Sequence, residues 1–240
     1  MIDILAKLTA VLLLALIADA LFRRSPAALL HRLWTGAIIC ALILPFVHLP
    51  QRAEANTIYV LAAAPLEAAP ISQAPASIPL ATLPGILFAC WTAGAVLVAL
   101  RAAFGLFQIW RITRAASPLP TPTAPVPIVL SSAIPVPMTW GVRRPVILLP
   151  TGASEWPDSR LRSAIAHEVA HIERRDWLVQ MFALAVCSVY WFHPLAWLAA
   201  RRLSSHAEHA CDDRVLLSGT TPADYAADLV KKVIAGQAVE

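Results

Sequence analysis

Long apolar stretches separated by short charged segments dominate this chain. Four of them approach or exceed the length of a membrane-crossing helix: residues 4–22, 33–50, 84–100 and 177–200. The first contains only Lys7 and Asp19 as charged residues, and the other three contain no Asp, Glu, Lys or Arg. Because about 20 apolar residues cross a bilayer as a helix, this pattern predicts an integral membrane protein.

The first stretch has an alternative interpretation as a signal peptide, because Ala18-Asp19-Ala20 resembles a small-x-small cleavage site. The flanking charges argue against it. A signal peptide begins with basic residues, whereas here the basic residues follow the apolar stretch, at Arg23, Arg24 and Arg32. We therefore predict a membrane helix whose far end faces the cytoplasm.

Basic residues in the loops predict the orientation of the remaining segments. Residues 23–32 contain three Arg, residues 51–83 contain only Arg52, and residues 111–176 contain eight Arg. Basic loops remain on the cytoplasmic side. The N-terminus and an extended Ala/Pro-rich loop at 51–83 are therefore expected outside a bacterial inner membrane, and the chain after Trp110 is expected to begin in the cytoplasm.

The region after the third stretch combines short β-rich runs with helices. Two runs, residues 127–130 and 145–149, are flanked by Pro, which disfavours central strands and favours edge strands or a hairpin through Trp140-Gly141. Three helices are predicted on hydrophobic spacing and end signals: from Asp158 or Ser159, from 195 to 217 ending at Ser218-Gly219, and over 222–235.

Composition supports the membrane assignment and limits the other possibilities. Of 240 residues, 58% are apolar and only 14% are charged, compared with about 25% charged in an average globular protein. The net charge of +4 follows from the basic loops and requires no nucleic-acid partner. The four Cys form no CxxC pair, so neither a disulfide framework nor a cysteine metal site is indicated.

The segment His167-Glu168-Val169-Ala170-His171 has the HExxH form of a zinc-hydrolase helix. In a helix, His167 and His171 project from one face and can bind the same metal ion. Glu168 lies about 100° around the helix, beside the metal rather than on it. There it can act as the general base on a water molecule that Zn²⁺ has made acidic.

A catalytic zinc needs a third protein ligand, and the residues just after the motif do not supply one. A metzincin arrangement requires a Gly and a His that residues 172–182 lack. Glu208 is the better candidate, with Asp212 one turn later on the same face to fix the tautomer of a ligand histidine. An ordinary solvated Glu208 remains the alternative. His193, beside Pro194, is expected to be structural, and His206 and His209 point to other faces.

Glu208 as a ligand would constrain the path of residues 177–200. A single crossing of about 36 Å would place Glu208 on the opposite side of the membrane from the histidines. The chain must therefore turn back, and the one strong helix breaker is Phe192-His193-Pro194. The segment from His171 to this breaker is longer than the segment from the breaker to Glu208. This difference predicts a bend near residues 174–177 or strongly tilted helical segments. This segment is then re-entrant or interfacial.

Substrate contacts are less strongly indicated than the metal ligands. The run Val146, Ile147, Leu148 and Leu149 could hold an extended peptide by edge pairing. The group that stabilises the oxyanion besides zinc stays open among His209, Arg214 and Tyr225.

Four motifs in order resemble the BlaR/MecR family of integral-membrane metallopeptidases. They are GVRRPVILLP from Gly141, HEVAHIERRD, WFHPLAW and AEHACDDRVL. The resemblance implies a gluzincin-type zinc site with His167, His171 and Glu208 as ligands and Glu168 as general base. It also implies an endopeptidase facing the cytoplasm that acts in regulatory signalling, by cleaving itself or a transcriptional repressor.

The expected fold is mainly α, with multi-pass membrane helices and a metallopeptidase domain that carries a small edge-strand element. We expect a three-helix membrane region at 1–110 and the peptidase at 111–240, including the embedded segment 177–200. The given sequence stops before the family's penicillin-binding sensor domain, so we expect either a fragment of a longer sensor protein or a protease core that works with another sensor, such as a separate subunit or a homodimer. The alternatives are a Ste/Htp-like quality-control protease and a catalytically silent signalling scaffold.

Overall fold

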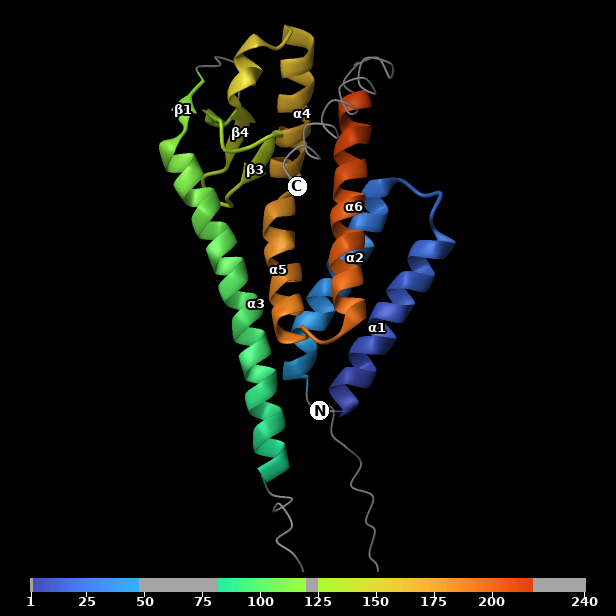
Figure 1. The fold of residues 1–240 in the computed structure, drawn as a ribbon. Coiled ribbons are helices and arrows are strands. Elements are labelled where there is room, and N and C mark those ends of the chain that lie inside the picture. The colour runs from blue at the N-terminus through green and yellow to red at the C-terminus, as the bar shows by residue number, and fades with distance from the viewer. Residues whose placement is uncertain (1, 48–81, 120–124, 218–240) are drawn as a thin grey trace, which may run out of the picture.

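The computed structural model describes residues 2–47, 82–119 and 125–217, which form a mainly helical molecule with one small sheet (Figure 1). The helices are α1 (Ile2–Leu21), α2 (Ala27–Ile43), η1 (Leu44–Phe46), α3 (Thr82–Ala115), η2 (Thr151–Glu155), α4 (Asp158–Arg174), α5 (Asp176–Val189) and α6 (Pro194–Leu217). The strands are β1 (Ser117–Pro118), β2 (Ile128–Ser131), β3 (Met138–Trp140) and β4 (Val146–Pro150). Most of the predicted 51–83 loop, the end at Ser218-Gly219 and the 222–235 helix lie outside the described residues.

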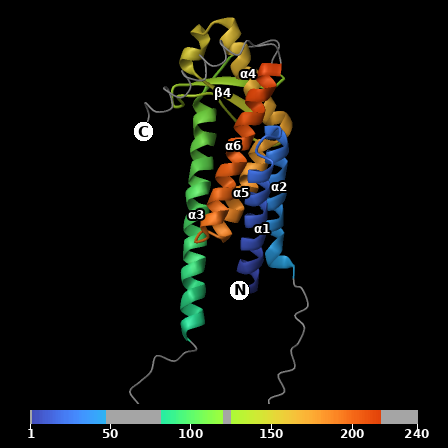
Figure 2. The same cartoon turned by 90° about the vertical axis from the view of Figure 1, so that its right-hand side faces the viewer.

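Helices α1, α2, α5 and α6 pack into one bundle, in which α5 and α6 run antiparallel (Figures 1 and 2). The turn between them is closed by hydrogen bonds from His193 N to Tyr190 O and from Ala196 N to His193 O. Pro194 begins α6, where its missing N–H is not needed. The predicted return of the chain at His193-Pro194 is therefore confirmed.

A shared apolar core holds this bundle together. Its buried residues come from α1 and α2 and from α5 and α6 or the turn between them: Leu8, Leu12, Ala15, Trp34, Ala37, Ile38, Ala41, Ala183, Val186, Tyr190, Ala196, Ala199 and Leu203. Small residues on α6 allow α2 and α5 to approach it closely. The segments on both sides of the predicted boundary at residue 110 thus share one core.

The bend predicted near residues 174–177 is present between α4 and α5. Arg175 adopts the left-handed conformation, with φ of 57°, and its N–H bonds to the carbonyls of His171 and Ile172. This is a common way to end a helix. The chain leaves α4 in a new direction, and α5 starts at the next residue.

Helix α3 stands at the side of the bundle (Figures 1 and 2). It contacts the bundle at the end of α5 and the turn that follows α5. Trp91 Nε1 donates to Val189 O at 3.0 Å, and Trp191 Nε1 donates to Trp91 O at 3.1 Å. Gly94 lies so close to Trp191 that an added Cβ would be 2.2 Å from the indole ring. Glycine at this position is therefore needed for α3 to approach α5.

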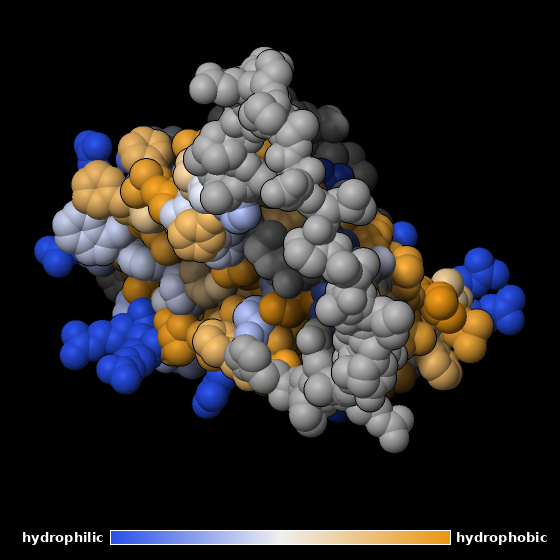
Figure 3. Space-filling view, turned by 90° about the horizontal axis from the view of Figure 1, so that it is seen from below, coloured by the Kyte–Doolittle hydropathy of each residue, from blue (hydrophilic) through white to orange (hydrophobic). Residues whose placement is uncertain are grey.

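Within the described residues, three helices are long and apolar enough to cross a membrane: Asp3–Leu21, Ala27–Phe46 and Leu83–Ala115. Many of their large apolar side chains are exposed, including Leu14 on α1 and Phe88 and Phe104 on α3. Viewed from the end opposite the sheet, hydrophobic residues occupy much of the visible surface (Figure 3). Such a surface is unusual for a water-soluble monomer and suits contact with lipid.

The described strands form a mixed sheet in the order β1-β2-β4-β3. β2 and β4 are parallel, whereas β1–β2 and β3–β4 are antiparallel. The hairpin through Trp140-Gly141 is confirmed, with Trp140 opposite Val146. The edge-strand prediction was wrong for β2 and β4, which are paired on both sides. Pro150 stands only at the end of β4, so the residues before it keep the N–H groups that pairing requires.

The sheet fixes the position of α4. Buried Ile128, Ile147 and Leu149 pack against Leu161, Ile165, Val169 and Ile172 on one face of that helix. At the other end of the sheet, Trp140 Nε1 donates to Thr113 Oγ1 of α3 at 2.9 Å, and its ring lies 6.5 Å from that of Trp177. The face of α4 turned away from this apolar core carries polar side chains toward α6.

Candidate metal centre

The two histidines of the HExxH segment lie on the face of α4 that is turned toward α6. Their Nε2 atoms are 3.2 Å apart, and the ring centroids are 4.9 Å apart at a steep angle. His167 is buried and His171 is nearly so. The four-residue spacing along one helix therefore brings two imidazole nitrogens to one point, as the sequence predicts.

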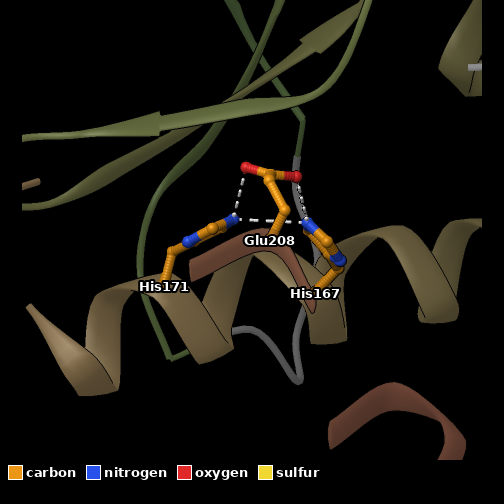
Figure 4. Close-up of side chains that lie close together, drawn as sticks. All are labelled: His167, His171 and Glu208. Carbon is orange, nitrogen blue, oxygen red and sulfur yellow. Dashed lines mark hydrogen bonds and ion pairs between the residues drawn. The ribbon is translucent and has the colours of Figure 1, made fainter. Parts of the chain in front are cut away.

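Glu208 reaches the same point from α6, a different helix (Figure 4). Its two carboxylate oxygens lie 3.5 Å from His167 Nε2 and 3.5 Å from His171 Nε2. Zinc bonds of about 2.0–2.1 Å in tetrahedral geometry place neighbouring ligand atoms about 3.3 Å apart. The three side chains therefore bring donor atoms close enough together to hold one metal ion.

Each histidine is held at its other ring nitrogen by a carboxylate. His167 Nδ1 lies 3.1 Å from Asp212 Oδ1, and His171 Nδ1 lies 2.8 Å from Asp176 Oδ2. Such contacts fix the ring orientation and favour the tautomer with its proton on Nδ1, in which Nε2 can bind a metal. Sequence reasoning anticipated Asp212 but missed Asp176, the last residue of HEVAHIERRD. Asp176 follows the break at Arg175, so helical spacing alone could not show where it points.

The surroundings of His171 favour the protonated form of its ring. Burial alone would lower the pKa of the His171 imidazole, but hydrogen bonds with Asp176, Cys211 and Glu208 outweigh it and raise the pKa to about 12. A metal at Nε2 competes with that proton, so metal binding at this site is coupled to proton release.

A second group of donors shares His171 but uses its opposite nitrogen. Cys211 Sγ lies 3.3 Å from His171 Nδ1 and 3.8 Å from Asp176 Oδ2. Cys211 and Asp176 are fully or almost fully buried, and Cys211 does not line the cleft described below. This second group is suited to orienting His171, whereas the Nε2 group faces space that a substrate can enter.

That space is a cleft of about 190 Å³ between the sheet and the helices. Its walls comprise Pro137, Met138, Thr139, Glu168, His171, Asp176, Trp177, Gln180, Ala207 and Glu208. Glu168 is only 3% exposed, yet it lines this cleft beside two of the candidate ligands. β3 forms one wall, so an edge strand, a carboxylate and the metal-ligand group border the same space.

A comparison with known protein families agrees with this arrangement. The family described as BlaR1 peptidase M56 matches residues 2–240, nearly the whole chain. The chain belongs to this family. Among curated proteins, it is 36% identical over 86 residues to the regulatory protein BlaR1 of Bacillus licheniformis. The aligned part covers 36% of this chain but only 14% of that relative.

Membership of the BlaR1 peptidase family has a direct consequence for the activity. The domain is a peptidase domain, and peptidases of this family are generally metallopeptidases. The His/Glu group supplies residues able to hold such a metal. The apolar helices, together with the family, indicate a membrane protein.

Several other residues considered from the sequence do not reach the cleft. Val146–Leu149 form the interior strand β4, so their predicted role in edge pairing with a substrate is wrong. Arg214 pairs with Glu173, and neither Arg214 nor His209 lines the cleft. Tyr225 lies outside the described residues. His193 contacts Thr9 of α1, away from the metal ligands.

Proposed function

We propose that this protein is a zinc-dependent endopeptidase of the membrane, with His167, His171 and Glu208 as the metal ligands. The observation that carries the proposal is the convergence of two imidazole nitrogens of α4, 3.2 Å apart, on the Glu208 carboxylate of α6, which places a different oxygen 3.5 Å from each nitrogen. Histidine nitrogens and a carboxylate oxygen are donors that zinc takes in hydrolases, and Glu168 of the same helix lines the cleft beside them.

In this proposal the protein's residues divide the chemistry among them. When bound, zinc supplies a Lewis acid that polarises the peptide carbonyl and makes a water molecule acidic. Glu168 accepts the proton from the attacking water and returns it to the leaving amine as general acid. Asp212 and Asp176 keep the two imidazoles oriented while charge develops in the cleft.

The substrate is proposed to bind as an extended peptide along β3. Within the described residues β3 pairs only with β4, so its second edge offers backbone N–H and C=O groups. Met138 and Thr139 of this strand line the cleft beside Glu168. This assigns to β3 the role that the sequence suggested for β4.

The site is proposed to face the cytoplasm. The α1–α2 loop lies at the same end of the bundle as the sheet, and α3 also ends there (Figure 1). This loop contains Arg23 and Arg24, and the last turns of α3 contain Arg111 and Arg114. Basic residues gather on the cytoplasmic side of membrane proteins. This arrangement supports an outside N-terminus, three crossings by α1–α3, and residues 177–200 as an embedded segment of a peptidase region spanning 111–240.

The biological role is proposed to be regulatory proteolysis, of the protein itself or of a transcriptional repressor. The support is membership of the BlaR1 peptidase family and similarity to a protein named as a regulator. The partners in this proposal are a protein substrate and the bilayer, with a sensor subunit or a second copy as the source of the signal.

Cleavage of a denatured general substrate such as casein, and of the chain itself, by detergent-purified protein tests the proposed activity. The native protein should cleave, while Glu168→Gln should lose about 10²-fold or more of the rate and keep its metal, because only the proton acceptor is removed. A chelator should abolish cleavage, and added zinc should restore it. Equal cleavage by both proteins would refute Glu168 as the base, and metal without cleavage in either would favour a signalling scaffold.

A further inference from the structure

Asp176 is a buried carboxylate at which four helices meet. It begins α5, is only 4% exposed, and accepts a hydrogen bond from His171 of α4 through Oδ2. Its other oxygen, Oδ1, lies 3.4 Å from His31 Nε2 of α2 and 3.3 Å from Arg174 Nε. A buried carboxylate needs such donors, because burial without partners is costly for a charge.

His31 belongs to a part of the chain far from the HExxH segment. It lies near the start of α2, a candidate membrane span, and is 6% exposed. Its ring nitrogen faces the oxygen of Asp176 that does not contact His171. Together with Arg174, which donates to the same oxygen, this contact at Oδ1 would limit rotation of the carboxylate and keep Oδ2 directed at His171 Nδ1.

We propose that His31 is a positioning residue of the metal centre, which orients the ligand His171 through Asp176. The inference rests on the metal site proposed above. It means that the site is completed by a side chain from α2, one of the N-terminal membrane helices. A shift of α2 along the bundle would withdraw this donor, so the helix and the metal affinity are coupled.

The test compares two substitutions that separate hydrogen bonding from packing. His31→Gln keeps an N–H donor at a similar distance from the backbone, whereas His31→Met keeps an apolar side chain of similar bulk without a donor. The readouts are the dissociation constant for Co²⁺ or Zn²⁺ in competition with a chelator and the visible absorption spectrum of the Co²⁺-loaded protein. Neither depends on peptidase activity.

His31→Met should weaken metal binding by about tenfold, the lower end of the range for partners that orient a ligand, and should alter the Co²⁺ spectrum. His31→Gln should bind within about twofold of the native protein. Ile38→Val, in the core of the same helix, is the matched control: it should lower the melting temperature and leave metal affinity unchanged.

Two results would overturn the inference while leaving the proposed peptidase intact. One is native metal affinity in His31→Met, and the other is an equal loss in His31→Gln, which would show that the ring's shape rather than its donor matters. Failure of the native protein to bind either metal would instead refute the proposed zinc site and this inference together.

Discussion

Each candidate histidine ligand depends on a carboxylate from another helix. Asp212 of α6 serves His167, and Asp176 of α5 serves His171. Asp→Asn at either position keeps the size of the side chain but removes the charge that favours a metal-binding tautomer. We predict that each substitution lowers zinc affinity about 10- to 100-fold, measured by competition with a chromogenic chelator.

Asp213→Asn is the matched control for this prediction, because Asp213 is adjacent to Asp212 but exposed. It should bind zinc like the native protein. If Asp212→Asn and Asp176→Asn also retain native zinc affinity, the two carboxylates do not orient the metal ligands. That result would argue against His167 and His171 as the ligands.

At the residue level, the sequence predicted the site residues whose relative positions depend only on their spacing along one helix. The HExxH pair needed only the four-residue period of a helix, and Glu208 and Asp212 needed the same period on another helix. Their meeting depends on how α4 and α6 pack, which spacing on one helix cannot reveal. Asp176 and His31 were missed for this reason: one follows a left-handed residue, and the other lies over a hundred residues earlier.

Among the elements, the β3–β4 hairpin has the clearest link to function because it presents β3 to the cleft. Its turn contains Gly141 at φ +98°, where an added Cβ would lie 2.9 Å from the carbonyl oxygen of Arg144. Gly141→Ala should therefore destabilise the protein by about 1–3 kcal/mol, seen as a lower melting temperature in detergent. It should also weaken binding of peptide substrates, since the edge of β3 moves.

Gly152→Ala provides the comparison, because no atom lies within 4 Å of a Cβ added there and its φ is not positive. It should leave the melting temperature and peptide binding nearly unchanged. An equal effect of the two substitutions would show that the conformation of the Gly141 turn has no special part in placing β3.

The order of the strands was the feature of the elements that the sequence did not supply. The prolines at the ends of residues 145–150 were interpreted as signs of an edge strand. The residues between them nevertheless keep the backbone N–H groups that pairing on both sides requires. Whether β4 lies at an edge depends on β2, which pairs with it in parallel from the other side. Helix ends were more predictable, because Pro194 acts locally on the backbone. The unequal lengths of chain before and after it predicted either a bend near residues 174–177 or strongly tilted helices, and the structure has the bend.

The whole molecule combines a membrane-type bundle with a metal-ligand group at one end of it. α1 and α2 share a core with α5 and α6, and α6 carries Glu208. Asp19 of α1 binds His206 and Arg202 of α6, which adds a polar link to the apolar one. The division at residue 110 into a membrane region and a peptidase region therefore stays a prediction, and the two regions share one apolar core.

The central claim is that one zinc ion binds to His167, His171 and Glu208, and X-ray absorption at the zinc edge of the purified protein tests it most directly. We predict about one zinc per chain, nitrogen and oxygen neighbours at about 2.0–2.1 Å, and the outer-shell features of two imidazoles. Cys211→Ala should give the same spectrum. A sulfur neighbour at about 2.3 Å that disappears in Cys211→Ala would place the metal at the opposite nitrogen of His171, and would contradict the account.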